Sequence, residues 1–376
     1  HIFNAAVKIA PLPQNRAIKT CIVTISLARG GAERSTALLS KMLENQGHTV
    51  HVVTLNDAVD YAHGGTLMNL GKLKTKNDTL IKRLKRFAVL KRFFTEQNFD
   101  LIIDNRNRSR ALRELYYMLY LYKNERVIYV VRSYNLGAYL PKNGWVAKQM
   151  VRKAEAIVGV SRAITQAVNK RYGTTKAQTI YNPIAVFKIE ETTQKNTEGY
   201  IIFLGRLYES TKNFSLLLEG YKKSGLPSKN IKLKIFGDGP DRSFILKKAA
   251  TLGLQAFVQL NAFTPHIGAQ LKNAKFLVLT SHYEGFPRVL VEALSVGTPV
   301  VSVNCKSGPD EIIAHGENGL LVPNYDPVAL AAAMDRFFDD VPLYLHCRAN
   351  AVESVAHLHP ATIGRQWQNL IQKWLR

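Results

Sequence analysis

The chain has 376 residues, and 46% of them are hydrophobic, which supports sizeable folded cores and excludes a globally disordered protein. The formal net charge is +23, from 51 Lys and Arg against 28 Asp and Glu. No uninterrupted apolar run reaches the roughly 18 residues of a membrane-spanning helix, and the length suggests about two domains.

The N-terminal stretch, residues 1–16, is set apart from the fold prediction. The sequence begins with His1 and shows no signal-peptide pattern, so we interpret this stretch as an expression remnant or a trimmed end.

The next part of the chain, residues 17–185, alternates buried apolar runs with helical patterns. One helix is predicted over residues 32–46, and it ends at Gly47, a residue favoured just past a helix C-terminus. Alternation of strands and helices predicts a parallel sheet covered by helices, as in a Rossmann-like domain. The predicted strands are 22–27, 49–55, 101–104, 127–131 and 157–160.

A second series of strands and helices begins after a polar segment at residues 182–199. We assign residues 195–358 to a second Rossmann-like domain and expect a cleft between the two domains. The predicted strands are 200–204, 232–236, 276–279 and 299–303.

The last segment, residues 359–376, carries apolar residues at the spacing of one helical face. These are Trp367, Leu370, Ile371, Trp374 and Leu375, at positions i, i+3, i+4, i+7 and i+8. The pattern predicts an amphipathic helix that packs on a core.

The positive charge is concentrated in the first half of the chain. Residues 1–189 hold 31 Lys and Arg against 11 Asp and Glu, a balance of +20, whereas the remainder has 20 against 17, a balance of +3. An anionic partner for the first half is the natural expectation. The charge alone leaves three explanations for this excess: binding to nucleic acid, binding to an anionic surface, or a basic face that only keeps the protein soluble.

The three cysteines, Cys21, Cys305 and Cys347, are scattered and odd in number. They indicate neither a disulfide framework nor a zinc site, because no Cys-x-x-Cys pair is present. A reducing, cytoplasmic compartment is expected.

The segment from Ser281 to Pro299 is the most informative in the chain, because it reads as the loop and helix that follow a strand. Pro287 suits the first helical position, and Gly297 closes the helix. The free N–H groups at the start of this helix would form an anion-binding site, helped by the helix dipole. These amides belong to Arg288, Val289 and Leu290.

Two carboxylates flank that predicted anion site, Glu284 on the loop and Glu292 in the second helical turn. Carboxylates there would repel a phosphate but would accept hydrogen bonds from hydroxyl groups. They therefore indicate a ligand with a sugar and a ribose, unless they are ordinary surface side chains.

Arg206 and Lys212 follow the first strand of the second domain, directly after Gly205. Ligands of open α/β sheets bind at such strand ends. Two fixed cations can neutralise a diphosphate without a metal. A pair of solvated surface cations is the plain alternative.

Glycine-rich turns follow two further strands. Gly30 and Gly31 let the backbone approach a phosphate closely, and Gly237 opens a similar loop, although either loop can be a simple turn. There is no Asp-x-Asp motif, and the ten histidines lack metal-ligand spacing, so no metal site or bound cofactor is predicted.

Residues 80–94 form a basic amphipathic pattern. The apolar arc contains Leu80, Ile81, Leu84, Phe87, Ala88 and Phe94, with Lys91 intruding, while Lys82, Arg83, Lys85, Arg86 and Arg92 lie around the rest. Such a helix can lie on an anionic bilayer, and the same stripe can also pack on a sheet.

Glu284 and Glu292 together resemble the Glu-x7-Glu signature of the retaining family 4 glycosyltransferases, which have the GT-B fold. The Gly-Thr-Pro-Val-Val that follows at residues 297–301 is similar to that family as well, as are Gly205-Arg206, Lys212-Asn213, residues 237–240 and residues 30–33. The resemblance extends over nearly the whole chain from about residue 18.

The resemblance implies a role for each matching residue. Glu292 would bind the ribose, and Glu284 would bind the transferred sugar with the backbone of Gly285 and Phe286. Arg206 and Lys212 would hold the diphosphate. The remaining donor-binding residues would be Gly30, Gly31, Gly205, Gly237, Arg288, Val289 and Leu290. The last helix would cross back to the N-terminal, acceptor-binding domain.

Two positions depart from the family pattern. Pro287 stands where many relatives have Gly, Ser or Cys, which removes one backbone donor. The strand at 127–131 is followed by Arg132-Ser133-Tyr134-Asn135 instead of the family histidine. Arg132, Ser133 and Asn135 are therefore the candidates for contact with the acceptor, and Arg132 is also a candidate for charge stabilisation.

The function implied is retaining transfer of a sugar, with UDP expected as its carrier, to a glycan or lipid-linked acceptor of bacterial surface polysaccharides or glycoconjugates. The enzyme is expected to need no metal and to lie at the inner face of the cell membrane. A nucleotide-sugar epimerase is the second hypothesis, and it would need acid and base groups facing the sugar ring. A nucleic-acid-binding protein is the third; it lacks the recognition motifs of known modules, so no nucleic-acid partner is predicted.

Overall fold

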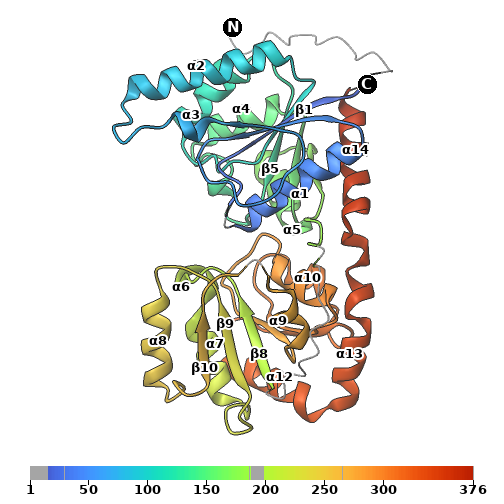
Figure 1. Ribbon diagram of the computed structural model, residues 1–376. Coiled ribbons are helices and arrows are strands. Elements are labelled where there is room, and N and C mark those ends of the chain that lie inside the picture. The colour runs from blue at the N-terminus through green and yellow to red at the C-terminus, as the bar shows by residue number, and fades with distance from the viewer. Residues whose placement is uncertain (1–15, 29, 186, 188–198, 265, 376) are drawn as a thin grey trace. The chain divides into compact units, whose positions relative to one another are not determined.

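A computed structural model of the protein describes residues 16–28, 30–185, 187, 199–264 and 266–375 (Figure 1). The chain forms two compact units. The first unit contains the residues up to Pro183 together with those from Pro360 onward, and the second contains Ile184–His359. Most of the N-terminal stretch 1–16 and of the polar segment 182–199 lies outside the described residues.

The first unit is built on a parallel sheet with the strand order β3-β2-β1-β4-β5-β6-β7 among the described residues. The central strand β1 pairs in parallel with β2 on one side and with β4 on the other. Ile22 of β1 lies opposite Val52 of β2 and opposite Ile103 of β4. The strands are β1 Lys19–Thr24, β2 Thr49–Thr54, β3 Thr66–Asn69, β4 Leu101–Asp104, β5 Val127–Val131, β6 Ala156–Gly159 and β7 Ala177–Thr179.

Helices connect these strands in the order expected for a doubly wound fold. They are α1 Gly31–Asn45, α2 Leu80–Gln97, α3 Ala111–Tyr116, α4 Gly144–Lys153 and α5 Arg162–Tyr172, with short helical turns at Leu70–Leu73, Tyr117–Leu121 and Leu136–Ala138. The last helix, α14 Pro360–Leu375, packs against α1 and buries Trp367, Leu370 and Ile371. This burial accounts for the apolar stripe of the last segment.

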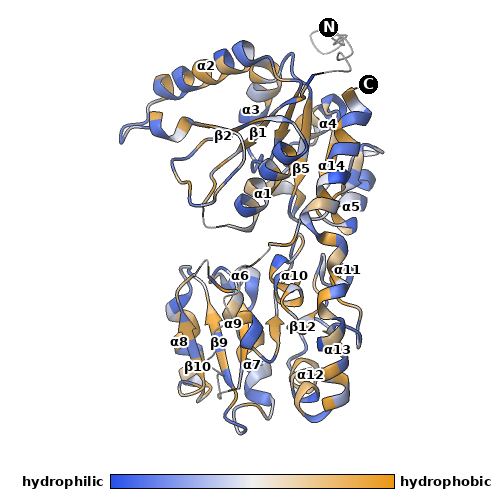
Figure 2. Ribbon diagram, turned by 45° about the vertical axis from the view of Figure 1, so that its right-hand side comes forward, coloured by the Kyte–Doolittle hydropathy of each residue, from blue (hydrophilic) through white to orange (hydrophobic). Residues whose placement is uncertain are grey.

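The second unit has a parallel sheet with the strand order β10-β9-β8-β11-β12-β13. Its strands are β8 Tyr200–Leu204, β9 Lys232–Phe236, β10 Val258–Asn261, β11 Leu277–Leu279, β12 Val300–Val303 and β13 Gly319–Val322. Its helices are α6 Glu209–Lys212, α7 Phe214–Lys223, α8 Arg242–Thr251, α9 Gly268–Asn273, α10 Arg288–Ser295, α11 Pro309–Ile312, α12 Pro327–Asp339 and α13 Val341–Ser354, with a short turn at Ala356–Leu358. Hydrophobic residues are concentrated in the strands of both units (Figure 2).

The prediction of two parallel-sheet, Rossmann-like units is confirmed. Its strand boundaries differ by one to three residues at β1, β2, β6, β11 and β12, and the prediction is wrong in omitting β3, β7, β10 and β13. β3, β7 and β10 are short and partly exposed, so none of them presents a continuous apolar run.

The strand order of each sheet reverses at one place, between β1 and β4 in the first unit and between β8 and β11 in the second. Connections leave such neighbouring strands in opposite directions, which opens a crevice at their carboxyl ends. The residues predicted for binding follow β1, β5, β8, β9 and β11, so they lie at or beside these two reversals. Within the described part of the chain, no helix has the length and apolarity needed to cross a membrane.

Candidate functional site

The loop after β8 carries Gly205, Arg206 and Lys212 to the carboxyl end of the second sheet. The Gly205 amide donates to the Phe236 carbonyl at 3.1 Å. A side chain at Gly237 would place its Cβ 1.8 Å from the Gly205 carbonyl oxygen, and Gly237 has a φ of +156°. Gly237 is therefore required by this close approach of two loops. Arg206 is exposed at the start of the loop.

Lys212 and Glu284 form an ion pair between the loops after β8 and β11. Lys212 Nζ lies 2.5 Å from Glu284 Oε1, and both side chains are mostly buried. The Ser281 hydroxyl donates to the same carboxylate oxygen at 2.6 Å. The structure thus brings together the predicted diphosphate cation and the predicted sugar-binding carboxylate.

The loop that bears Glu284 is fixed by its backbone as well. The Glu284 amide donates to the Lys306 carbonyl at 2.7 Å, and the Ser307 hydroxyl donates to the Gly285 carbonyl at 2.8 Å. Phe286, in the same loop, is buried. Lys306 and Ser307 follow the neighbouring strand β12, and no motif in the sequence marks them as supports.

Helix α10 begins one residue later than predicted. Pro287 is the capping residue before the helix, and Arg288 is the first helical residue. The Leu290 amide donates to the Pro287 carbonyl at 3.0 Å, so the expectation that this amide is free is wrong, because the first turn of the helix closes on it. Val289 is partly exposed in the same turn.

Glu292 lies within α10 and is only 7% exposed. Arg288 Nη2 lies 3.5 Å from Glu292 Oε1, one helical turn away. Gly297 adopts a φ of +81° beyond the C-terminus of the helix, as expected for a closing glycine.

Cys305 lies in the same region and was not predicted as part of it. Burial raises the pKa of its thiol to about 12, and the negative charge of Glu284 adds to the effect. A thiol with such a pKa stays protonated near neutral pH, so Cys305 is a packing residue rather than a nucleophile.

In the first unit, the glycine loop leads directly into α1. Gly31 is the first helical residue, and Gly30 is the capping residue with an extended backbone. Arg29, between the strand and these glycines, lies outside the described residues.

Arg132 follows β5 and is held by two asparagines. Its Nε and Nη2 donate to Asn105 Oδ1 at 3.2 and 3.1 Å, and its Nη1 donates to Asn182 Oδ1 at 2.5 Å. Ser133 and Asn135 lie on the same loop, where the Asn135 amide donates to the Ser133 hydroxyl. Neither asparagine that contacts Arg132 was predicted, because both come from distant loops without a recognisable motif.

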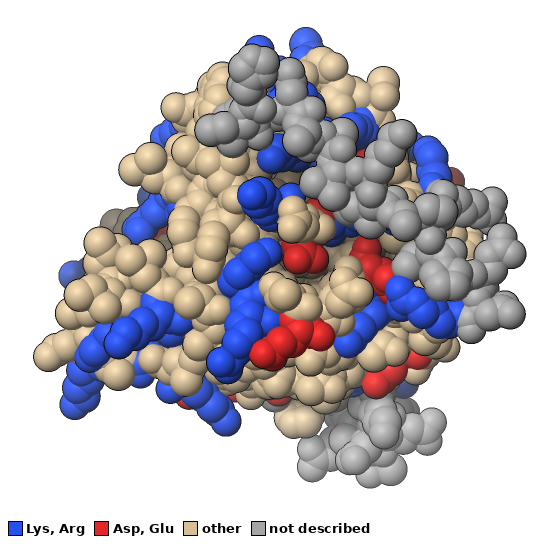
Figure 3. Space-filling model, turned by 90° about the horizontal axis from the view of Figure 1, so that it is seen from above, with Lys and Arg blue, Asp and Glu red and all other residues tan. Residues whose placement is uncertain are grey.

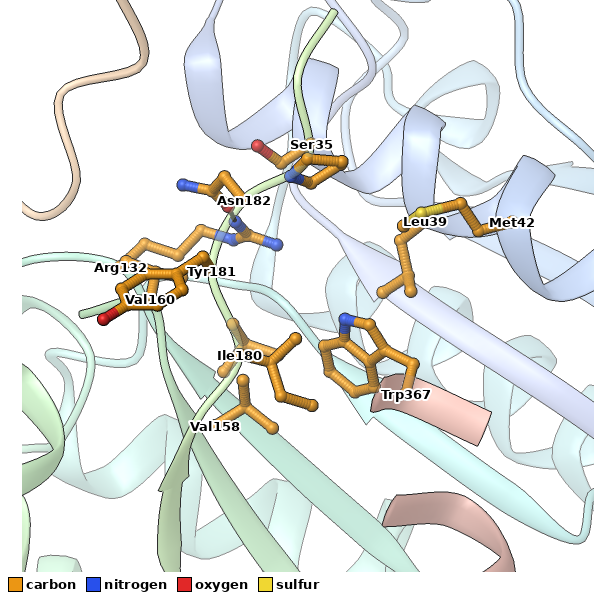
Figure 4. A pocket seen from close by; sticks show the side chains of 12 residues that line it. Ser35, Leu39, Met42, Arg132, Val158, Val160, Ile180, Tyr181, Asn182 and Trp367 are labelled. Carbon is orange, nitrogen blue, oxygen red and sulfur yellow. Dashed lines mark hydrogen bonds between the residues drawn. The ribbon is translucent and has the colours of Figure 1, made fainter. Parts of the chain in front are cut away.

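A small cavity opens beside Arg132 (Figure 4). Asn182 and Ser35 lie with Arg132 at its polar end, and Leu39 and Trp367 lie at its apolar end. The cavity has room for about one water molecule.

A buried ion network follows β4 and was also missed. Arg106 Nη2 lies 2.7 Å from Asp104 Oδ2 and 2.9 Å from Glu114 Oε2, with all three side chains fully or almost fully buried. Arg108, equally buried, donates to the carbonyls of Tyr139 at 2.9 Å and Val130 at 2.7 Å. The network holds the loop after β4 against β5 and the segment around Tyr139, and the charges of Asp104 and Glu114 offset those of the two arginines.

Within the described residues, no group of three or more His, Cys, Asp or Glu side chains is arranged to hold a metal ion.

Two protein-family models match the chain. Residues 29–186 match the model described as Glycosyltransferase Family 4, and residues 187–354 match the model described as Glycosyl transferases group 1. The boundary between them falls close to the division between the two structural units.

Curated relatives are similar to parts of the chain or to most of it. An exopolysaccharide phosphotransferase of Streptomyces coelicolor is 34% identical over 46% of this chain, and an amylovoran biosynthesis glycosyltransferase of Erwinia amylovora is 27% identical over 46%. The chain spans only 18% and 48% of the lengths of these two relatives. A Campylobacter jejuni enzyme named as an N-acetylgalactosaminyltransferase acting on a diphospho-undecaprenol saccharide is 25% identical over 81% of this chain and 86% of its own length.

Solved structures share the fold. HepE of Anabaena, in complex with UDP and glucose, superposes with a TM-score of 0.77 at 18% identity and covers 95% of this chain and 100% of its own. The apo lipopolysaccharide outer core galactosyltransferase WaaB has a TM-score of 0.68 at 19% identity, covering 95% of this chain and 99% of its own.

Proposed function

We propose that this chain, which joins a Glycosyltransferase Family 4 domain to a glycosyl transferases group 1 domain, transfers a sugar from a nucleotide-sugar donor with retention at the anomeric carbon. The observation that carries the proposal is the Lys212–Glu284 pair at the strand reversal of the second unit. A cation for a diphosphate and a carboxylate for sugar hydroxyls lie there one hydrogen bond apart.

The proposed donor is a UDP-sugar bound by the second unit. Arg206 and Lys212 bind the diphosphate, Glu284 binds hydroxyls of the sugar, and Glu292 binds the ribose. The amides of Arg288 and Val289 lie at the start of α10. They place the positive end of the helix dipole beside the phosphates. UDP is supported by HepE, a protein of the same fold that was solved with UDP and glucose.

Negative charge grows on the leaving diphosphate as the anomeric bond breaks, while the sugar becomes oxocarbenium-like. Lys212 and Arg206 stabilise that charge, and Ser281 and Lys212 hold the Glu284 carboxylate in place for the sugar. Fixed charges of this kind need no reorganisation during the reaction, which makes them effective. No metal is required in this scheme.

The proposed acceptor is a glycan or a lipid-linked saccharide of a bacterial surface polymer. The support comes from the names of relatives, which include exopolysaccharide, amylovoran and diphospho-undecaprenol enzymes. Arg132, Ser133 and Asn135 would contact the acceptor from the first unit.

We further propose that the enzyme works at the inner face of the membrane, where α2 would contact anionic lipid. Leu80, Ile81 and Leu84 are 72%, 67% and 47% exposed, so the first two turns of α2 do not pack on the sheet. Lys82, Arg83 and Lys85 are exposed beside them. Lys and Arg side chains are numerous on the face of this unit shown in Figure 3.

The apolar arc predicted for this helix is too long, because its C-terminal part belongs to the core. Phe94 is fully buried, and the Phe87 ring packs against Tyr116 and Tyr117 at centroid distances of 5.5 and 5.6 Å. Arg86 is engaged with Asp78, whose pKa is lowered to about 2 by that hydrogen bond. Only the first two turns therefore present apolar and basic groups together.

A thermal-shift panel tests the central proposal. Ligands that bind the native state raise its melting temperature. We expect UDP and one or more UDP-sugars to raise Tm, and we expect Lys212→Gln to reduce that rise. A panel in which no nucleotide or nucleotide sugar shifts Tm contradicts the proposal.

A further inference from the structure

We propose that Thr280 is a positioning residue whose buried hydroxyl holds the turn that carries Lys212, so that the Lys212 ammonium is fixed for binding the diphosphate of the donor. This inference rests on the proposed function, and it adds a residue outside the predicted site on which donor binding depends. It is carried by the hydrogen bonds that join the end of β11 to α6.

Thr280 directly follows β11 and is fully buried. Its hydroxyl lies 3.0 Å from the carbonyl oxygen of Lys212 and 3.2 Å from that of Asn213. A hydroxyl has one proton, so the two carbonyls share it in a bifurcated hydrogen bond. The contact attaches the backbone of Lys212 to a strand 68 positions away in the chain.

Helix α6 is too short to hold Lys212 in place by itself. It contains four residues, Glu209–Lys212, which is about one turn, and such a short helix is marginal without outside contacts. The chain then reverses direction at Asn213, which has a left-handed φ of +54°. Carbonyls at the end of a helix lack intrahelical partners, and the Thr280 hydroxyl supplies a donor for them at the residue that carries the site cation.

Three consecutive residues after β11 hold both partners of the ion pair. The His282 amide donates to the Thr211 carbonyl at 2.9 Å, which attaches α6 to this loop a second time. The Ser281 hydroxyl donates to Glu284 Oε1 at 2.6 Å. Thr280 and His282 therefore hold the turn that bears the lysine, whereas Ser281 holds the carboxylate.

The side chain of Lys212 is confined along its length as well. A Cβ built on Gly205 would lie 3.3 Å from Lys212 Cε, so the lysine stem passes close to this glycine. At the tip, Lys212 Nζ contacts Glu284 Oε1 at 2.5 Å. An ammonium has three N–H donors, so it can keep Glu284 and contact a phosphate oxygen at the same time. The backbone of Lys212, held by Thr280, stays in place when a phosphate competes with Glu284 for the ammonium.

The test is calorimetric titration of the full chain with UDP, which is the probe for diphosphate binding. Thr280→Val removes the hydroxyl and keeps the size of the side chain, and we expect it to raise the Kd for UDP about fivefold, the scale of one lost hydrogen bond. Thr280→Ser keeps the hydroxyl and should stay within twofold of the wild type.

Thr298→Val is the matched control. Thr298 is also buried in the second unit, and its hydroxyl donates to the Leu271 carbonyl at 2.7 Å. The variant therefore loses a comparable hydrogen bond away from the Lys212 turn. Its Kd for UDP should stay within twofold of the wild type, and a loss as large as that of Thr280→Val would overturn the inference.

A double variant separates positioning from simple packing. If Thr280 acts through Lys212, adding Thr280→Val to Lys212→Gln should change the Kd for UDP less than twofold beyond Lys212→Gln alone, because the effects of two residues that act as one unit do not add. A full further loss in the double variant shows that Thr280 acts independently of Lys212 and overturns the inference. Binding of UDP by Thr280→Val as tight as that of the wild type also overturns it.

Failure of the proposed function gives a different pattern. A wild-type chain that binds no UDP, or a Lys212→Gln variant that binds UDP like the wild type, contradicts the proposed donor site and overturns the inference with it. If Thr280→Val does not fold, Thr280→Ala removes the same hydroxyl with a smaller side chain and replaces it in every measurement.

Discussion

Lys212 Nζ donates to Glu284 Oε1 at 2.5 Å, although the two residues are 72 positions apart in the chain. The contact exists because β8 and β11 are neighbours in the sheet, so the loops that leave their carboxyl ends meet. In the proposed reaction Lys212 binds the leaving diphosphate and Glu284 binds the transferred sugar. The groups on the two sides of the breaking bond therefore hold each other in position.

Loss of the Lys212 cation is expected to slow turnover strongly. Lys212→Gln removes charge stabilisation from the leaving diphosphate, and we expect kcat to fall about 100-fold, the scale found for removal of one such stabilising group. Arg206→Gln should act in the same direction. Steady-state kinetics with a UDP-sugar checks this, with Lys223→Gln, an exposed change at the end of α7, as the control. A loss of less than threefold in Lys212→Gln would contradict the role.

Glu292→Ala is expected to weaken nucleotide binding without unfolding the protein. The carboxylate is proposed to accept hydrogen bonds from the ribose, and buried charged hydrogen bonds of this type contribute about 1.5–3 kcal/mol, or at least tenfold in Kd. Calorimetry with UDP measures the change, and Glu353→Ala, on the exposed side of α13, is the control. An affinity within twofold of the wild type would remove the ribose assignment.

Activity is expected to survive treatment with EDTA. Lys212, Arg206 and the start of α10 supply the positive charge that a divalent ion supplies in other diphosphate sites. The measurement is the transfer rate before and after chelation and after re-addition of Mg²⁺ or Mn²⁺. A rate that vanishes with EDTA and returns with metal would show that the cations are insufficient.

The sequence predicts the sheets well because their central strands are continuous apolar runs, such as Val127–Val131, that are fully buried. The sequence predicts Lys212 and Glu284 as separate candidate residues. It does not predict their contact, because the local sequence pattern does not determine which strands are neighbours in the sheet. Arg106 and Arg108 contribute to the positive charge of the first half, yet both are fully buried. Arginine is rarely buried unless paired, and the pairing here depends on Glu114 from a different element.

Acidification is expected to loosen the first unit through His48. The imidazole contacts the Thr20 hydroxyl at 3.0 Å and the Gln368 side chain of α14 at 2.5 Å. Burial lowers the pKa of His48 below its usual 6.5, which means that the unfolded chain takes up the proton first as pH falls. The contribution of neutral His48 to stability is therefore present above about pH 6.5 and is lost as pH falls from there toward the lowered pKa.

We expect Tm to fall between about pH 7.5 and 5.5 and expect His48→Gln to make this fall smaller. Burial also lowers the pKa of His51, so a part of the slope should remain in the variant. His357→Gln in the second unit is the control and should keep the wild-type slope. An identical slope in His48→Gln would contradict the assignment.

The start of α2 is expected to bind anionic liposomes through both its charge and its apolar side chains. Each basic residue near an anionic surface contributes about 1 kcal/mol, so Lys82, Arg83 and Lys85 changed together to Gln should weaken binding on the order of 100-fold. Arg83 and Arg86 both pair with Asp78, but the Arg83 side chain is 55% exposed and that of Arg86 only 11%, so Arg86 is left unchanged. The double variant Leu80→Ser and Leu84→Ser instead removes exposed apolar area. It should weaken the part of the liposome binding that high salt does not abolish.

Co-sedimentation with liposomes of anionic and of neutral lipid, at low and high salt, measures these effects. The matched control changes three exposed lysines of the second unit, Lys222, Lys223 and Lys247, to Gln, which alters net charge equally and leaves α2 intact. If that control loses binding as much as the α2 variant, the attraction comes from net charge and not from α2. Equal recovery on neutral and anionic liposomes, or none at low salt, would remove the membrane proposal while leaving the transferase proposal unchanged.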